Sequence, residues 1–196
     1  MRRIAGTLAV AMALLTMVAA CEDENPFRNT TPRVTTGVGQ VWELDLGGFP
    51  SGWVFASGER FFVGTGSTPS NGTWVLDAGP DGTLVFRPFE DLAPGLSRVR
   101  TAILDLTVSN GVQTFEAVTT VPETGYRSEP VEVVEGHVYA FRMSTLGGVV
   151  IPINYGKLEV VEVGRETPGD ERSRFVLFRW AYQNQPLNRN LRVEEQ

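Results

Sequence analysis

The chain contains a single histidine, His137, which opens an alternating apolar segment. Successive side chains of a β-strand point to opposite faces, so one face of this segment carries His137, Tyr139, Phe141 and Met143. Histidine and methionine are both axial ligands of haem iron, which makes this face a candidate for a haem or other small-ligand site. The alternative, and the more common arrangement, is a strand that packs Tyr139 and Phe141 into a core and leaves His137 exposed at its start.

The four tryptophans are a second source of binding surface. Exposed indole rings form stacking platforms for sugars or peptides, whereas buried ones contribute to a core. At least two of the four are expected in the core. The segment 49–53 contains proline and glycine and is best suited to expose an aromatic side chain, so Trp53 is the candidate for a glycan-binding loop.

No arrangement of residues identifies a catalytic centre. One histidine and one cysteine exclude a Cys/His zinc cluster and an intramolecular disulfide framework, and no serine lies in a nucleophile-elbow pattern. The carboxylates of Glu43 and Asp45 alternate with apolar residues in a strand predicted over 41–46, so they are interpreted as its solvent-facing side. We therefore expect a non-enzymatic protein without a metal site or cofactor, with haem at the His137 face as the alternative.

The composition is that of a globular protein. The 196 residues are 42% hydrophobic and 20% charged, which argues against bulk disorder. The 21 glycines and 12 prolines favour many short strands over long helices. The net charge of −6 argues against a nucleic-acid-binding protein.

The N-terminus has two arginines followed by an uncharged, mostly apolar run over 4–18. As a helix this run would be ~22 Å long, short of the ~30 Å hydrocarbon core, so a signal peptide fits better than a spanning helix. The run ends in Val-Ala-Ala-Cys, which resembles the lipobox of bacterial lipoproteins. That resemblance implies removal of residues 1–20 and acylation of Cys21, which would hold the protein on a membrane. The alternative is an ordinary secretory signal in which Cys21 is incidental.

Residues 21–37 are predicted to form the acylated cysteine and a flexible tether, because they lack apolar periodicity. The acidic run after Cys21 resembles the surface-export signal of some outer-membrane lipoproteins. In other bacteria, an acidic residue directly after the cysteine resembles an inner-membrane retention signal. We expect a location in the cell envelope, at the outer membrane, on its periplasmic face or on the cell surface.

The rest of the chain is predicted to be all-β, an antiparallel sandwich or open barrel. From residue 38 onward the apolar segments are short, rich in Val, Phe, Trp and Thr, and bounded by turn residues, with no room for βαβ crossovers. A Pro-Glu-Thr-Gly turn divides an N-terminal β region, 38–122, from a C-terminal β region, 123–196, as two sheets or two packed half-domains. The clearest hairpin is expected to join 98–108 to 112–121 around Ser-Asn-Gly.

Three segments of the C-terminal region follow one another in a distinctive order: Gly-His-Val-Tyr at 136–139, Tyr-Gly-Lys-Leu-Glu-Val-Val at 155–161, and an aromatic strand at 175–183. This order resembles the closing strands of haem-binding β-lipoproteins of the haemophore (HmuY-like) type, in which a Tyr-x-Lys-Leu strand precedes an aromatic strand. Lys157, the only lysine of the chain, occupies the lysine position of that pattern. The resemblance implies a shared β scaffold and, as a function of that family, haem binding.

These observations predict a lipid-anchored β protein of the cell envelope that acts as a non-enzymatic binding or structural accessory module. Its expected partners are the membrane, through the N-terminal lipid, and an envelope protein, whereas nucleic acid is not expected. One alternative is a surface lipoprotein that captures haem or another small ligand at the His137 face. A further alternative is a glycan-binding module that uses Trp53 or Trp74.

Overall fold

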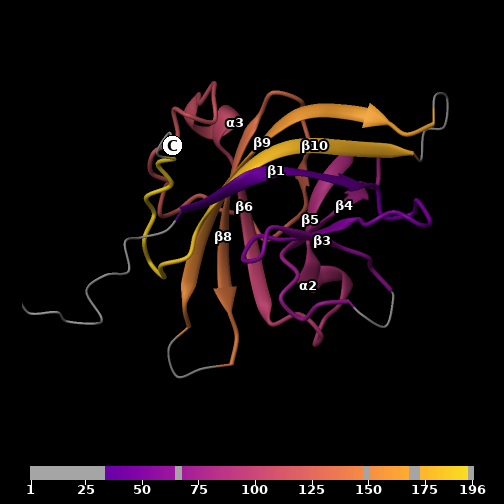
Figure 1. Cartoon of the computed structure of the whole chain (residues 1–196), viewed down its shortest axis with the longest axis horizontal. Helices are drawn as coiled ribbons and strands as arrows, with labels where there is room; N and C mark the ends of the chain where they lie inside the picture. Colours follow the sequence, from indigo (N-terminus) through magenta and orange to yellow (C-terminus); the bar gives the residue numbers. More distant parts are fainter. Residues whose placement is uncertain (1–33, 65–67, 148–150, 168–172, 194–196) are drawn as a thin grey trace, which may run out of the picture. The chain divides into compact units, whose positions relative to one another are not determined.

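The computed structural model describes residues 34–64, 68–147, 151–167 and 173–193, which form a sandwich of two antiparallel sheets (Figure 1). The larger sheet has the strand order β1 (Val34–Trp42), β10 (Arg174–Gln183), β9 (Ile153–Arg165), β8 (Val138–Thr145) and β6 (Val99–Asp105). The smaller sheet has the order β3 (Glu59–Phe61), β2 (Gly52–Val54), β4 (Trp74–Ala78), β5 (Leu84–Pro88) and β7 (Val131–Glu132). Within the described ranges, two short helices, α2 (Phe89–Leu92) and α3 (Leu106–Asn110), connect strands. The predicted all-β fold is confirmed, and its architecture is the sandwich.

Aromatic side chains fill the space between the two sheets. Alternate residues of β8 and β10 point inward, and Phe141 and Phe178 are among them. Their rings meet those of the smaller sheet, with centroids 5.9 Å apart for Phe86 and Phe141 and 5.4 Å apart for Trp74 and Phe178. Burial of such a side chain stabilises the fold by about 1.5–3 kcal/mol, so this inner core holds the sheets together.

The outer face of the larger sheet is also covered. Phe115 and Val118, from the segment after α3, and Leu191, from the segment after β10, are buried on this face. They pack with Ala140 of β8 and Tyr155 of β9. Because this part of the sheet is covered on both faces, a polar side chain on its outer face can be buried there as completely as one in the inner core.

Both predicted β regions contribute to both sheets. β1, from the first region, pairs along its whole length with β10, from the second, so that Val34 lies opposite Gln183. In the smaller sheet, β7 from the second region pairs with β5 from the first. The described residues belong to one compact unit with a shared inner core.

The prediction of a hairpin around Ser-Asn-Gly is wrong. β6 ends at Asp105, and the chain continues as α3, whose N–H of Val108 donates to Oδ1 of Asp105 at 3.0 Å. Gly111 ends the helix in the left-handed conformation, with φ of 67°. An aspartate N-cap and a glycine C-cap together favour a helical turn over a hairpin at these residues. The predicted strand over 112–121 is consequently absent.

β1 begins at Val34, inside the segment 21–37 that was predicted to be a tether. Pairing with β10 supplies hydrogen-bond partners to backbone whose side chains show no apolar periodicity, and local sequence cannot reveal that pairing. The remainder of the tether, the signal peptide and Cys21 lie outside the described residues.

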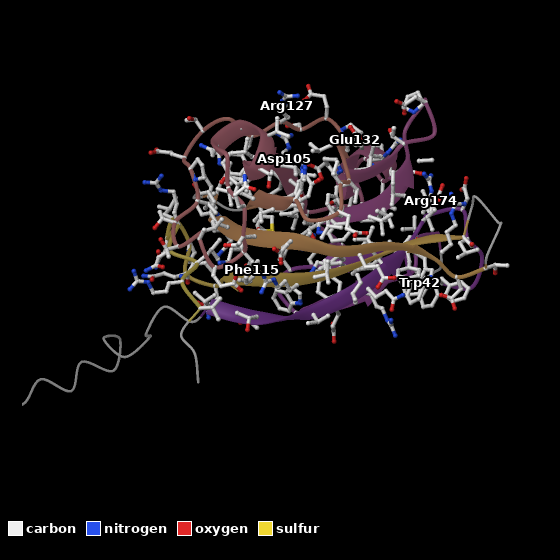
Figure 2. All side chains as sticks on the ribbon, turned by 90° about the horizontal axis from the view of Figure 1, so that it is seen from above. Trp42, Asp105, Phe115, Arg127, Glu132 and Arg174 are labelled. Carbon is white, nitrogen blue, oxygen red and sulfur yellow. The ribbon has the colours of Figure 1, made fainter. Side chains whose placement is uncertain are left out.

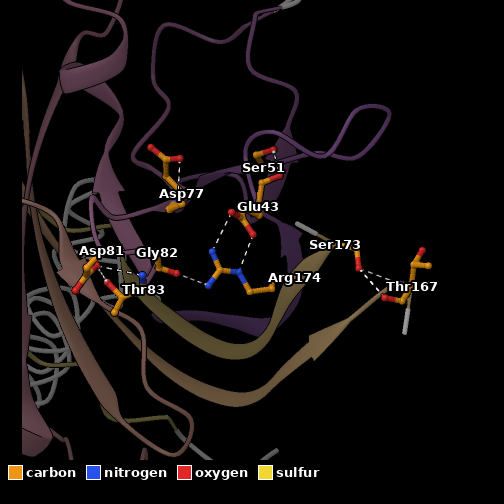
Figure 3. Close-up of polar contacts among 10 residues, drawn as sticks. Glu43, Ser51, Asp77, Asp81, Gly82, Thr83, Thr167, Ser173 and Arg174 are labelled. Carbon is orange, nitrogen blue, oxygen red and sulfur yellow. Dashed lines mark hydrogen bonds and ion pairs between the residues drawn. The ribbon is translucent and has the colours of Figure 1, made fainter. Parts of the chain in front are cut away.

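Glu43 does not lie on a solvent-facing strand surface, which corrects the prediction for 41–46. β1 ends at Trp42, and the carboxylate of Glu43 is buried, 5% exposed, against the guanidinium of Arg174 (Figure 3). Nε and Nη2 of Arg174 donate to the two carboxylate oxygens at 2.7 and 2.9 Å, and Nη1 donates to the carbonyl oxygen of Gly82 at 2.7 Å. The bidentate pair joins β10 to the residue that follows β1, and the hydrogen bond to Gly82 joins β10 to the turn between β4 and β5.

Candidate functional site

The candidate His137 face is divided between two environments. Tyr139, Phe141 and Met143 are buried in the inner core, and the hydroxyl of Tyr139 has two backbone hydrogen-bond partners. His137 precedes β8 and is partly exposed. A macrocycle at this face would have to replace the packing between the sheets.

Trp53 is also part of the inner core, where it is 3% exposed. Its ring centroid lies 5.0 Å from that of Phe178 and 5.6 Å from that of Trp180. The indole therefore stabilises the sandwich and is not presented on a loop. The other three tryptophans are buried as well: Trp42, Trp74 and Trp180.

The outer face of the larger sheet carries a pocket of about 360 Å³, which we call the Lys157 pocket. It is lined by Thr36, Gly37, Val38, Phe115, Glu116, Thr119, Lys157, Arg179, Trp180, Arg192 and Val193. Phe115 lies toward the end of the sheet away from Trp42 and Arg174 (Figure 2). A volume of this size is typical of a small-ligand site.

The register of the larger sheet explains how Lys157 is accommodated. Ala181 of β10 and Ala140 of β8 lie directly opposite Lys157 on the two neighbouring strands. These small side chains leave room for the aliphatic stem of the lysine. The segment after α3 covers it from outside, so Lys157 is only 1% exposed.

The ammonium group of Lys157 is held by backbone carbonyls. Nζ donates to the carbonyl oxygens of Phe115 and Val118 at 2.7 and 2.8 Å, and it lies 4.0 Å from the centre of the Phe115 ring. Burial lowers the pKa of Lys157 to about 8, and the nearby carboxylate of Glu116 opposes this shift. Lys157 therefore ties the covering segment to β9.

Arg179 lies at the centre of an ion-pair network beside Lys157. Its Nε donates to Glu159, its Nη1 donates to Glu116, and its Nη2 donates to Oε2 of Glu116 at 3.1 Å. The hydrogen bond to Glu159, followed by the one to Glu116, raises the pKa of Arg179, although burial opposes this. The guanidinium carbon also lies 4.9 Å from the centre of the Phe115 ring, so Arg179 is fixed in place.

Cations outnumber carboxylates at the Lys157 pocket: Lys157, Arg179 and Arg192 face Glu116, which lines the pocket, and Glu159, which holds Nε of Arg179. Among the described residues, Lys157 uses two of its three N–H donors, Arg179 uses three of five, and the side chain of Arg192 has no partner. The apolar part of the lining comes from Val38, Phe115 and Val193. Such a lining suits an anion that also carries an apolar group.

Sequence reasoning singled out Lys157 only within a resemblance pattern, and it missed Arg179 and Glu116. The available signal is that a chain with 17 basic Lys and Arg residues keeps a single lysine, and keeps it inside an apolar strand. Phe115 could not be recognised, because 112–121 reads as a strand of its own and not as a cover over β9.

A second pocket, of about 350 Å³, lies beside His137 and is also lined by Asp105, Arg127 and Glu132. Nδ1 of His137 is 2.8 Å from Oδ2 of Asp105. Figure 2 shows Asp105, Arg127 and Glu132 on the same side of the molecule. A histidine oriented by a carboxylate can present Nε2 to a ligand or a proton. Across the described ranges, however, no group of three or more His, Cys, Asp or Glu residues is placed to hold a metal ion.

No protein-family model matches the chain, and neither a curated protein nor a solved structure shows significant similarity to it. In the part of the chain that the structure describes, no helix has the length and apolar content needed to cross a bilayer. The geometry of the Lys157 pocket is therefore the main indication of function.

Proposed function

We propose that the protein is a non-enzymatic, lipid-anchored binding module of the cell envelope that captures an amphipathic anion in the Lys157 pocket. The observation that carries this proposal is the excess of cationic donors over acceptors beside an apolar wall. The ligand class that fits best is a carboxylate joined to an apolar or aromatic group, since the carboxylate takes the free N–H donors and the apolar group contacts Phe115.

The network is suited to holding a charge and not to moving a proton. Arg179 is held by two carboxylates and a ring, and arginine does not release its proton at physiological pH. Lys157 is engaged by two carbonyl oxygens. Arg192, without a partner among the described residues, is the group most available to a ligand.

Replacement of Arg192 by glutamine is expected to weaken binding of 2-naphthoate about tenfold, because one charge-assisted hydrogen bond is lost. Binding is measured by isothermal titration calorimetry on the chain from Glu22 onward, since the three apolar cores formed by the described residues all lie between positions 34 and 193. Arg100→Gln, at an exposed arginine outside the pocket, is the matched control and should leave the affinity unchanged. The neutral analogue 2-naphthamide should respond to neither substitution. Equal effects of the two arginine substitutions, or no binding of naphthoate at millimolar concentration, would contradict the proposal.

The lipid anchor is a separate part of the proposal and rests on the Val-Ala-Ala-Cys pattern that ends at Cys21. Cells expressing the full chain should incorporate radiolabelled palmitate into the protein, and the Cys21→Ser variant should not. The same substitution should release the protein from the membrane fraction, because the acyl chains supply the anchoring free energy. Labelling that persists in Cys21→Ser would remove the anchor from the proposal.

A further inference from the structure

The sandwich has four edge strands, and β1 differs from the other three. The larger sheet ends at β1 and β6, and the smaller sheet ends at β3 and β7. An edge strand exposes unpaired backbone N–H and C=O groups, and proteins normally shorten, charge or cover such edges.

The other three edge strands are protected in these ways. At β6, the N–H of Thr101 donates to Oε1 of Glu90 at 2.6 Å, and Ile103 exchanges both backbone hydrogen bonds with Arg127 at 2.8 and 2.9 Å. β3 and β7 are three and two residues long, and each carries charged side chains, namely Glu59, Arg60 and Glu132.

Among the described residues, β1 has none of these protections over positions 34–41, and only its last residue, Trp42, has a partner on the outward side, the carbonyl oxygen of Pro50. The strand is nine residues long, with no charged residue and no proline, and Val38 at its centre is 69% exposed. Such a strand is a template on which a further strand can add.

The hydrogen-bond pattern shows which groups of β1 face outward. The N–H of Glu43 donates to the carbonyl oxygen of Arg174, in continuation of the β1–β10 register, whereas the N–H of Trp42 turns away from β10 to the carbonyl oxygen of Pro50. N–H and C=O of one residue face the same side in an antiparallel ladder, and the side alternates along the strand. The backbone groups of Thr36, Val38 and Gln40 therefore point outward, and among the described residues they have no partner.

The open edge and the Lys157 pocket are contiguous. Thr36, Gly37 and Val38 of β1 line the pocket, and Val38 lies directly opposite Arg179. A strand added to β1 would lie about 4.8 Å beyond it and about 10 Å from β10. A side chain of that strand on the outer face would stand next to Val38, within reach of the long side chain of Arg179.

We infer that the ligand is an extended peptide segment of a partner protein, which adds to the larger sheet alongside β1 and places an acidic side chain in the Lys157 pocket. This inference rests on the proposed function and names the source of the anion. Main-chain hydrogen bonds to β1 supply affinity, and the cations of the pocket supply specificity. A second copy paired through its own β1 would fit less well, because β1 brings no carboxylate to the pocket.

The test uses a fluorescein-labelled nonapeptide of threonine and valine with one central glutamate, measured by fluorescence anisotropy. A peptide with glutamine in place of glutamate should bind about tenfold more weakly. Two further peptides carry N-methyl groups on one or the other set of alternate residues. Strand addition predicts that one of these two loses binding at least tenfold and that the other retains it, because only one set of amides faces β1.

Gln40→Pro removes one outward N–H of β1 without touching the lining of the Lys157 pocket, and proline is tolerated at a position whose N–H faces away from the sheet. It should weaken peptide binding at least tenfold and leave 2-naphthoate binding unchanged. Gln40→Val, which keeps the N–H, should leave both unchanged. If Gln40→Pro fails to fold, the two N-methylated peptides give the same information on the unaltered chain.

Four results would overturn the inference. Naphthoate binding without binding of the glutamate peptide at millimolar concentration would leave the proposed function standing and remove the peptide. Equal binding of the two N-methylated peptides would mean that β1 is not used. A dimer in light scattering that Gln40→Pro converts to a monomer would assign the edge to a second copy. Failure of naphthoate and peptide together would remove both proposals.

Discussion

Replacement of Glu43 by alanine is expected to lower the free energy of unfolding by about 3–5 kcal/mol, because it leaves the guanidinium of Arg174 buried without its bidentate partner. The pair is formed at 2.7 and 2.9 Å, and the two side chains are 6% and 17% exposed. Loss of one partner of a buried ion pair costs more than the pair itself contributes, since the desolvation of the remaining charge is no longer compensated. Urea unfolding followed by tryptophan fluorescence measures the change.

Two control variants separate this effect from ordinary loss of a surface charge. Glu116→Ala removes a carboxylate that also pairs with an arginine but is 66% exposed, and it should cost no more than about 1 kcal/mol. The double variant Glu43→Ala/Arg174→Met should recover part of the lost stability, because no uncompensated charge remains. A Glu43→Ala chain as stable as the Glu116→Ala chain would contradict the interpretation.

The stability of the protein should rise with pH between about 8 and 9.5 because of Lys157. Burial lowers the pKa of Lys157 from 10.5 to about 8, so over this range the unfolded chain holds a proton that the folded chain has released. Unfolding then takes up a proton, and the free energy of unfolding increases by up to about 1.4 kcal/mol per pH unit, or about 3 kcal/mol over the full interval between the two pKa values. The penalty for burying the charged form is therefore fully present below pH 8 and relieved above it.

Urea midpoints at pH 7.5, 8.5 and 9.5 test this expectation, with Lys157→Met as the matched variant. The variant should show no rise, because its side chain does not titrate. Measurements stop below pH 10, since burial raises the pKa of Tyr126 and Tyr139 and the ionisation of unfolded tyrosines then lowers stability. Parallel pH profiles for the two chains would show that the charge of Lys157 is not penalised in the folded state.

The fold class could be predicted because it depends on local patterns of apolar and turn residues. Alternation in 137–143 and the aromatic segment 175–183, with turn residues between the apolar segments, correctly indicated the strands β8 and β10, each with one face in a core. The prediction failed where the local sequence is compatible with both a strand and a capped helix. The segment after β6 alternates like a strand, but Asp105 caps a helix there and Gly111 ends it.

The Lys157 pocket could not be predicted, because it depends on contacts between distant parts of the chain. Nζ of Lys157 reaches carbonyl oxygens 42 and 39 residues earlier, and Arg179 reaches Glu116 across 63 residues. No hydrophobic periodicity in the sequence indicates that the segment after α3 folds over the outer face of β9. The same holds for Glu43, which reads as a surface residue until its partner, 131 residues away, is known.

The use of arginine in place of lysine makes the protein surface less reactive toward compounds that modify amines. Sixteen of the 17 basic Lys and Arg residues are arginines, and the one lysine, Lys157, is buried. The folded surface therefore offers no side-chain amine to reducing sugars or to lipid-derived aldehydes, which modify lysine by condensation. Guanidinium groups keep their charge beyond pH 12. Positive charge at Arg179 and Arg192 thus persists through acid and alkaline surroundings alike, whereas the charge that Lys157 adds to the pocket is lost above about pH 8. Anion capture should therefore weaken above that pH without being abolished.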